Sequence, residues 1–305
     1  MVRSPILLIP LYGSYSHSDF SQTKRDGGYR PSVFMTQGVE FAIWMMAGTL
    51  LGWILFLSKT LRNKLPLIPM PFLPTLLLLR LVTFSLRSSG FIFLLLVGLV
   101  TFLTAKFFRS CLALLLLLLL PILYMHLRST RAWDGQNLVE AAEKATGSKD
   151  RADSLAFRLL NETLLVEKAK QRIWLGWGGF QRSYVTNEKG EYISVPDGMW
   201  ILTFGKFGLF GLVSLSLSYL LPAFLFLKRY HTRLWAKPQW SPVMGFVTLM
   251  GLTMIDNLFI AMYNPVITPA MGGLVSFLIS LSPNPTSVQH LQHNPTIPIS
   301  TPRVI

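Results

Sequence analysis

Long apolar runs alternate with short polar turns along most of the sequence. Seven runs approach or exceed the length of a membrane helix: residues 34–58, 66–86, 91–108, 111–127, 199–227, 243–262 and 266–282. A helix needs about 20 mostly apolar residues to cross the hydrocarbon core of a bilayer. The pattern therefore predicts an all-α polytopic membrane protein with about seven transmembrane helices.

One polar segment, residues 128–198, is far longer than the turns. It contains residues 137–145, which have helical composition, and a second predicted helix that begins at Asp150 as its N-cap and runs to about Trp174. The apolar stripe of this helix consists of Leu155, Leu159, Val166, Ala169 and Ile173. The turn at 176–179 should end it, so we expect one long helical loop.

The domain organisation follows from this alternation. Residues 1–33 form an outer N-terminal segment, residues 34–127 carry transmembrane helices 1–4, and residues 128–198 form the outer loop. Residues 199–282 carry transmembrane helices 5–7. Residues 283–305, rich in Pro, Ser, Thr and Asn, are expected to be a disordered tail.

Composition excludes a soluble protein and points away from nucleic acid. Of 305 residues, 51% are hydrophobic and only 14% are charged, which leaves too little polar surface for a soluble chain of this size. The net charge of +14 comes from Lys and Arg scattered between apolar runs, which is the pattern of topology signals. Cys111 is the single cysteine, so no intrachain disulfide can form.

The basic turns predict the orientation. Residues 59–64, 106–109 and 228–237 are basic and contain no acid, so the positive-inside rule places them in the cytoplasm. The N-terminus and the 128–198 loop then lie outside, and the C-terminus lies in the cytoplasm. Arg87 is the lone basic residue in a short outer turn.

Four stretches together resemble one family. Arg158 to Arg182 reads RLLNETLLVEKAKQRIWLGWGGFQR, a helix opened by arginine and ended by a Gly-x-Gly turn. Asp197-Gly198 is followed by nine residues and Gly-x-x-Gly; residues 83–88 read TFSLRS, and residues 27–34 read GGYRPSVF. This order resembles the O-antigen ligase and O-antigen polymerase superfamily, whose ligases carry histidine where this chain has Asp197.

The resemblance implies glycan transfer at the outer face of the bacterial inner membrane. The donor would be a glycan on undecaprenyl pyrophosphate, and the acceptor a hydroxyl of another glycan or of a lipid A core. No metal or other cofactor is implied, because arginines hold the pyrophosphate. Family members usually carry further N-terminal helices, which we expect this chain to lack.

The same resemblance assigns site residues. Catalytic roles fall to Asp197, Arg87 and Arg158, and substrate binding to Arg30, Arg87, Arg158 and Arg182. The planar fork of arginine suits phosphate oxygens, and Asp197 is a candidate general base for the acceptor hydroxyl. Two alternatives stay open: the arginines extend to lipid headgroups, or Asp197 caps the following helix.

A non-enzymatic membrane protein, either a transporter or a degenerate family member, is the alternative class. A transporter predicts internal repeats and broken helices that meet at the bilayer midplane, and the sequence contains no convincing repeat. Four ionisable residues fall at one predicted depth inside the apolar runs: Glu40, Arg80, Lys206 and Asp256. Unpaired charges there are costly, so we expect Arg80 or Lys206 to pair with Glu40 or Asp256.

Overall fold

Helices account for almost all regular structure in the computed structural model. It describes residues 24–25, 28–29, 31, 33, 35, 38–60, 71–86, 88–179, 181–261 and 266–280. The helices are α2 (Gly38–Leu57), α3 (Phe72–Ser85), α4 (Ser89–Phe108), α5 (Leu112–Thr130), α6 (Gln136–Thr146), α7 (Lys149–Lys170), α8 (Met199–Arg229), α9 (Thr232–Trp235), α10 (Ser241–Phe259) and α11 (Ile267–Ser280). Two strands, β1 (Lys24–Arg25) and β2 (Gly28–Tyr29), pair antiparallel.

Five of the described helices are long and apolar enough to cross a membrane, and the chain is accordingly a helical membrane protein. They are α2, α4, α5, α8 and α10, with 19 to 31 residues each. The other two predicted spans fall on α3 and α11, which have 14 residues each. Seven spans therefore stay a prediction, although each apolar run does fall on a helix.

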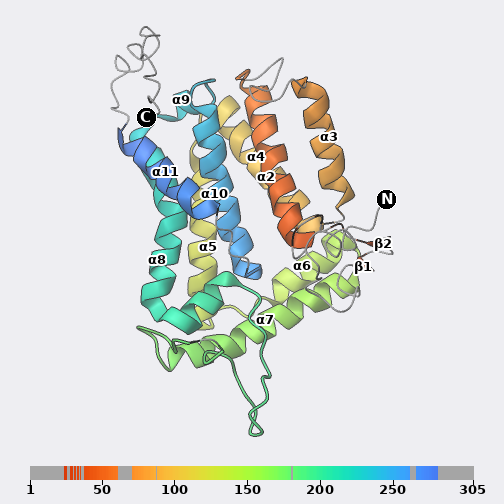
Figure 1. The fold of residues 1–305 in the computed structure, drawn as a ribbon, viewed down its shortest axis with the longest axis vertical. Helices are drawn as coiled ribbons and strands as arrows, with labels where there is room; N and C mark the ends of the chain where they lie inside the picture. Colours follow the sequence, from red (N-terminus) through yellow and green to blue (C-terminus); the bar gives the residue numbers. More distant parts are fainter. Residues whose placement is uncertain are drawn as a thin grey trace, which may run out of the picture.

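The helices are arranged with two distinct ends (Figure 1). α2, α3, α4, α5, α8 and α10 run roughly alongside one another, whereas α6 and α7 lie across one end of the group, here called the α7 end. The C-terminal ends of α2, α4 and α8, and all of α9, lie at the opposite end. The described basic residues Lys59, Lys106 and Lys228 lie at these C-terminal ends, so they share one side. Which side faces the cytoplasm stays a prediction.

α10 forms the centre of the packing. In the apolar 18-residue stretch of α10, 67% of the residues are buried, compared with 33–39% in the corresponding stretches of the other four long helices. It packs against α8, α2, α5 and α4. The outer helices expose large apolar side chains, among them Leu78, Phe93 and Leu123. Exposed leucine and phenylalanine on apolar helices are typical of a lipid-facing surface.

α8 is broken at Gly208, which corrects the prediction of a continuous helix. Gly208 has φ 65° and ψ −160°, a conformation open to glycine. The turn that follows α7 docks into the break through four backbone hydrogen bonds. Trp177 N–H and Gly178 N–H donate to the carbonyls of Gly205 and Lys206, and Leu209 N–H and Phe210 N–H donate to those of Ile173 and Trp174, at 2.7–3.2 Å.

Replacing Gly208 with alanine should destabilise the fold. A Cβ atom at this position would lie 2.3 Å from the carbonyl oxygen of Trp174, and backbone atoms cannot move aside as a side chain can. The positive φ alone costs about 1–3 kcal/mol for a non-glycine residue. We expect Gly208→Ala to lower the thermal unfolding temperature in detergent clearly. Gly48→Ala is the control, because no atom lies within 4 Å of its Cβ position; equal unfolding temperatures would contradict this reading.

The start and end of α7 differ from the prediction. The helix begins at Lys149 with Ser148 as its N-cap, and Asp150 lies in the first turn. It ends at Lys170 rather than near Trp174, because residues 171–175 form the turn that reaches α8. The predicted cap at Asp150 is therefore wrong, although its charge still lies at the end of the helix where the dipole favours an anion.

The predicted pairing of membrane charges is also wrong for both cations. The Arg80 guanidinium lies over the rings of Trp53 and Phe84, at 6.0 and 5.8 Å from their centroids. The Lys206 ammonium lies 5.2 Å from the ring centroid of Phe207. Among the described residues, no ion pair joins either cation to Glu40 or Asp256. Contact with an aromatic face is the way these two charges are accommodated.

Candidate functional site

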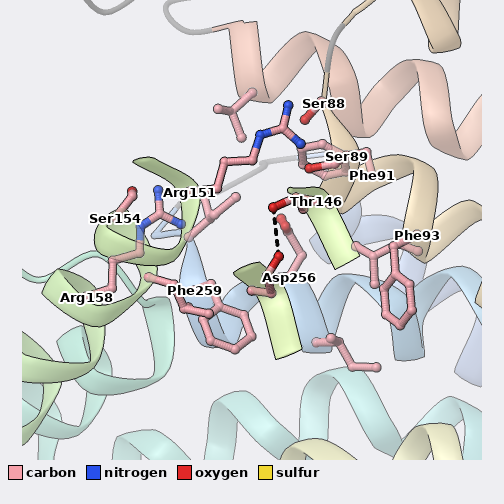
Figure 2. Close-up of a pocket in the computed structure, with 17 residues that line it drawn as sticks. Ser88, Ser89, Phe91, Phe93, Thr146, Arg151, Ser154, Arg158, Asp256 and Phe259 are labelled. Atoms are coloured by element: carbon pink, nitrogen blue, oxygen red, sulfur yellow. Dashed lines mark hydrogen bonds between the residues drawn. The ribbon is translucent and has the colours of Figure 1, made fainter. Parts of the chain in front are cut away.

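A cavity of about 390 Å³ lies at the α7 end of the molecule (Figure 2). Its walls come from the first turns of α4, from α6 and α7, and from the C-terminal end of α10. The lining is mostly apolar and includes Phe91, Phe93 and Phe259. α7 lies across the ends of the membrane helices, so it covers the cavity on the side away from the bilayer.

Positively charged and hydrogen-bonding groups face this cavity from two elements. Arg151 and Arg158 are seven residues apart on α7, with Ser154 between them, so two helical turns place them on one face. Ser88 and Ser89 lie at the N-terminus of α4, and Figure 2 shows Arg151 extending toward them. The N-terminus of a 20-residue helix carries a partial positive charge. The site therefore has the electrostatics of an anion-binding site.

Asp256 contributes a carboxylate to the same cavity from α10. The residue is only 8% exposed. Within the described part of the chain, its carboxylate makes no hydrogen bond and no ion pair, and Arg158 is the cation whose charge acts on it. A buried carboxylate without a partner is costly, so this side chain is available to accept a hydrogen bond from a bound molecule.

Arg158 also pairs with Asp197 beside the cavity. Arg158 Nε lies 3.6 Å from Asp197 Oδ2, and the two side chains are 36% and 35% exposed. A half-exposed pair of this length is worth about 0–1 kcal/mol, so a ligand can displace it at little cost. The N-cap of α8 is Gly198, so the alternative that Asp197 caps this helix is wrong.

A buried ion pair fixes α7 over α5 one turn beyond Arg158. Arg128 Nε donates to Glu162 Oε1 at 2.6 Å, and Tyr124 also donates to this carboxylate. The other four N–H groups of Arg128 bond to acceptors on either side: the carbonyls of Trp133, Asp134 and Leu159 and the hydroxyl of Thr163. Burial raises the pKa of the Glu162 carboxyl, while the hydrogen bonds from Arg128 and Tyr124 act in the opposite direction.

The structure brings together two of the five predicted site residues, Arg158 and Asp197. Arg182 is exposed and lines neither the large cavity nor a small one between Arg158 and Asp197. The predicted substrate-binding role of Arg182 thus finds no support in its position. Arg30 and Arg87 lie outside the described residues, so their predicted roles stay predictions.

Sequence reasoning missed Arg151 as a cavity residue and did not assign Asp256 to the site. The signal for Arg151 was its spacing of seven residues from Arg158, which puts both on one helix face. The signal for Asp256 was an ionisable group within an apolar run. Within the described ranges, no three His, Cys, Asp or Glu side chains gather in a way that could hold a metal ion.

Comparison with known proteins adds no family assignment. No protein-family model matches this sequence, and no curated protein matches it either. The resemblance to the O-antigen ligase and polymerase superfamily therefore rests on the motifs quoted above.

Proposed function

We propose that this protein transfers a glycan from undecaprenyl pyrophosphate to a hydroxyl acceptor at the outer face of a bacterial inner membrane, as O-antigen ligases and polymerases do. The observation that carries the proposal is the position of Arg158. Its guanidinium stands between a cavity suited to anions and the carboxylate of Asp197. Arg158 could therefore contact both the donor pyrophosphate and Asp197, the residue proposed to accept the proton of the acceptor hydroxyl.

The cavity suits the two halves of such a donor. Arg151, Arg158 and the N-terminus of α4 would hold the pyrophosphate. The apolar lining would contact the first isoprene units, and Phe93, 64% exposed on α4, leads from the cavity to the outer surface of the helices. The charged head would thus lie at the membrane surface while the tail stays in lipid.

The reaction needs one bond made and one broken. The acceptor hydroxyl oxygen attacks the anomeric carbon of the donor sugar, and the bond from that carbon to the pyrophosphate oxygen breaks. The hydroxyl proton passes to the Asp197 carboxylate or to the departing pyrophosphate. The leaving group gains negative charge as the bond breaks, and fixed arginine charges stabilise it.

The break in α8 favours this proposal over a transporter. Transporters of the broken-helix type place their breaks near the bilayer midplane. In α8, 21 residues, 209–229, follow Gly208. At 1.5 Å per residue they span about 30 Å, the full hydrocarbon thickness. The break therefore lies at a membrane surface rather than at the midplane.

The test is a transfer assay on the reconstituted protein with Asp197→Asn. We expect a loss of about 100-fold or more if Asp197 accepts the proton, whereas a near-normal rate would assign it to orienting the acceptor. Asp153→Asn is the matched control, because Asp153 is exposed on α7 outside the cavity. Wild-type protein that transfers no glycan from undecaprenyl pyrophosphate to a glycan or a lipid A core would contradict the proposal.

A further inference from the structure

The docked turn and the break in α8 together present a patch of exposed apolar side chains. The patch consists of Ile173, Trp174, Leu175, Phe207 and Phe210. Trp174 and Leu175 are 71% and 76% exposed. Backbone hydrogen bonds between residues 173–174 and 209–210 place the two segments side by side, so the patch is continuous. A patch of this kind marks an interaction surface.

The depth of the patch identifies lipid as its occupant. Lys228 and Arg229 end α8 at the other side of the membrane. The 20 residues from Leu209 to Lys228 rise about 30 Å, which equals the thickness of the hydrocarbon core. The patch therefore lies where hydrocarbon meets the headgroups, a level at which tryptophan is enriched.

Cations border the patch on the α7 side. Lys170 and Arg172 are exposed at the end of α7 and in the turn after it. The Arg172 guanidinium lies 4.5 Å from the ring centroid of Trp177, and the Lys168 ammonium lies 4.0 Å from the same centroid. The acidic residue near the C-terminal end of α7, Glu167, is paired with Arg131. Basic groups beside an apolar surface at this depth attract anionic headgroups.

We propose that the turn at 173–175 inserts into the leaflet at the α7 end and that Lys170 and Arg172 bind the phosphates of anionic phospholipids. The patch supplies the apolar contact, and the cations supply the preference for negative charge. This anchor holds the end of α7 at headgroup level. It does not depend on glycan transfer, because none of its residues lines the cavity.

The first test measures depth. Leu175→Cys in a Cys111→Ser background is labelled with a fluorophore and reconstituted into nanodiscs that contain spin-labelled phosphatidylcholine. Lys189→Cys is the control, because Lys189 lies in the exposed turn between the bridged residues Thr186 and Tyr192, and the segment between α7 and α8 extends away from the helices (Figure 1). We expect lipid quenching to be several times stronger at position 175. Equal quenching at the two positions would overturn the insertion.

The second test measures headgroup preference. Protein is reconstituted into vesicles of equal phosphatidylglycerol and phosphatidylcholine, extracted, and its retained lipids are quantified. We expect phosphatidylglycerol to be enriched with wild type and not with Lys170→Gln/Arg172→Gln. Lys144→Gln/Lys149→Gln removes the same charge from exposed positions elsewhere on α6 and α7 and should keep the enrichment. Equal enrichment in both double variants would overturn the assignment to Lys170 and Arg172.

Discussion

Arg158→Ala is expected to reduce glycan transfer by about 100-fold or more, the usual effect of removing one group that stabilises transition-state charge. The loss has two causes, because Arg158 faces the cavity proposed to hold the pyrophosphate and also pairs with Asp197. Arg158→Lys should give an intermediate rate, since lysine keeps the charge but loses the planar fork. The measurement is the initial rate at which reconstituted protein transfers glycan from an undecaprenyl pyrophosphate donor.

Arg233→Ala is the control for this experiment. Arg233 is exposed on α9, at the opposite end of the molecule from the cavity, and its loss should leave transfer unchanged. Protein that carries Arg158→Ala and transfers at the wild-type rate would show that this arginine only extends to lipid headgroups. The whole assignment of the site would then be wrong.

Breaking the buried ion pair of Arg128 should have the largest effect on stability. Arg128→Met leaves the Glu162 carboxylate buried without its cation and removes the donors to three backbone carbonyls. Loss of one partner from a buried pair typically costs about 3–5 kcal/mol. Equilibrium unfolding in mixed micelles measures this difference in the free energy of unfolding.

A neighbouring exposed pair provides the control for Arg128. Arg131 pairs with Glu167, and these side chains are 51% and 49% exposed. Arg131→Met should therefore cost less than about 1 kcal/mol. Adding Glu162→Leu to Arg128→Met should recover part of the lost stability, because no charge is then left buried. Equal losses for Arg128→Met and Arg131→Met would show that burial gives Arg128 no special role.

The helices themselves could be predicted from local pattern. The apolar run 91–108 became α4 (Ser89–Phe108), and 199–227 became α8 (Met199–Arg229). Both signals are local, since length and apolar composition decide whether a segment spans a bilayer. The break at Gly208 could not be predicted, because the hydrogen-bonding partners of the residues around it lie 28 to 36 residues earlier in the chain.

The candidate site was predictable only where a local motif selected its residues. Motif spacing selected Arg158 and Asp197, and the structure places them together. Arg151 and Asp256 enter the cavity only because α7 folds across the ends of α4 and α10. Membrane depth likewise failed to predict the partners of Arg80 and Lys206, since an aromatic ring nearby in the fold can stabilise a cation as well as an acid can.

The hydrogen bonds between the docked turn and α8 have a consequence for motion. They join the end of α7 to α8, while Arg128 joins its middle to α5, so these three helices move as one body. The N-terminus of α4 forms the facing wall of the cavity. Under the proposed function, a donor with a long lipid tail would enter between α4 and this body, and the separation of α4 from α7, a motion of microseconds to milliseconds, would set the pace of turnover.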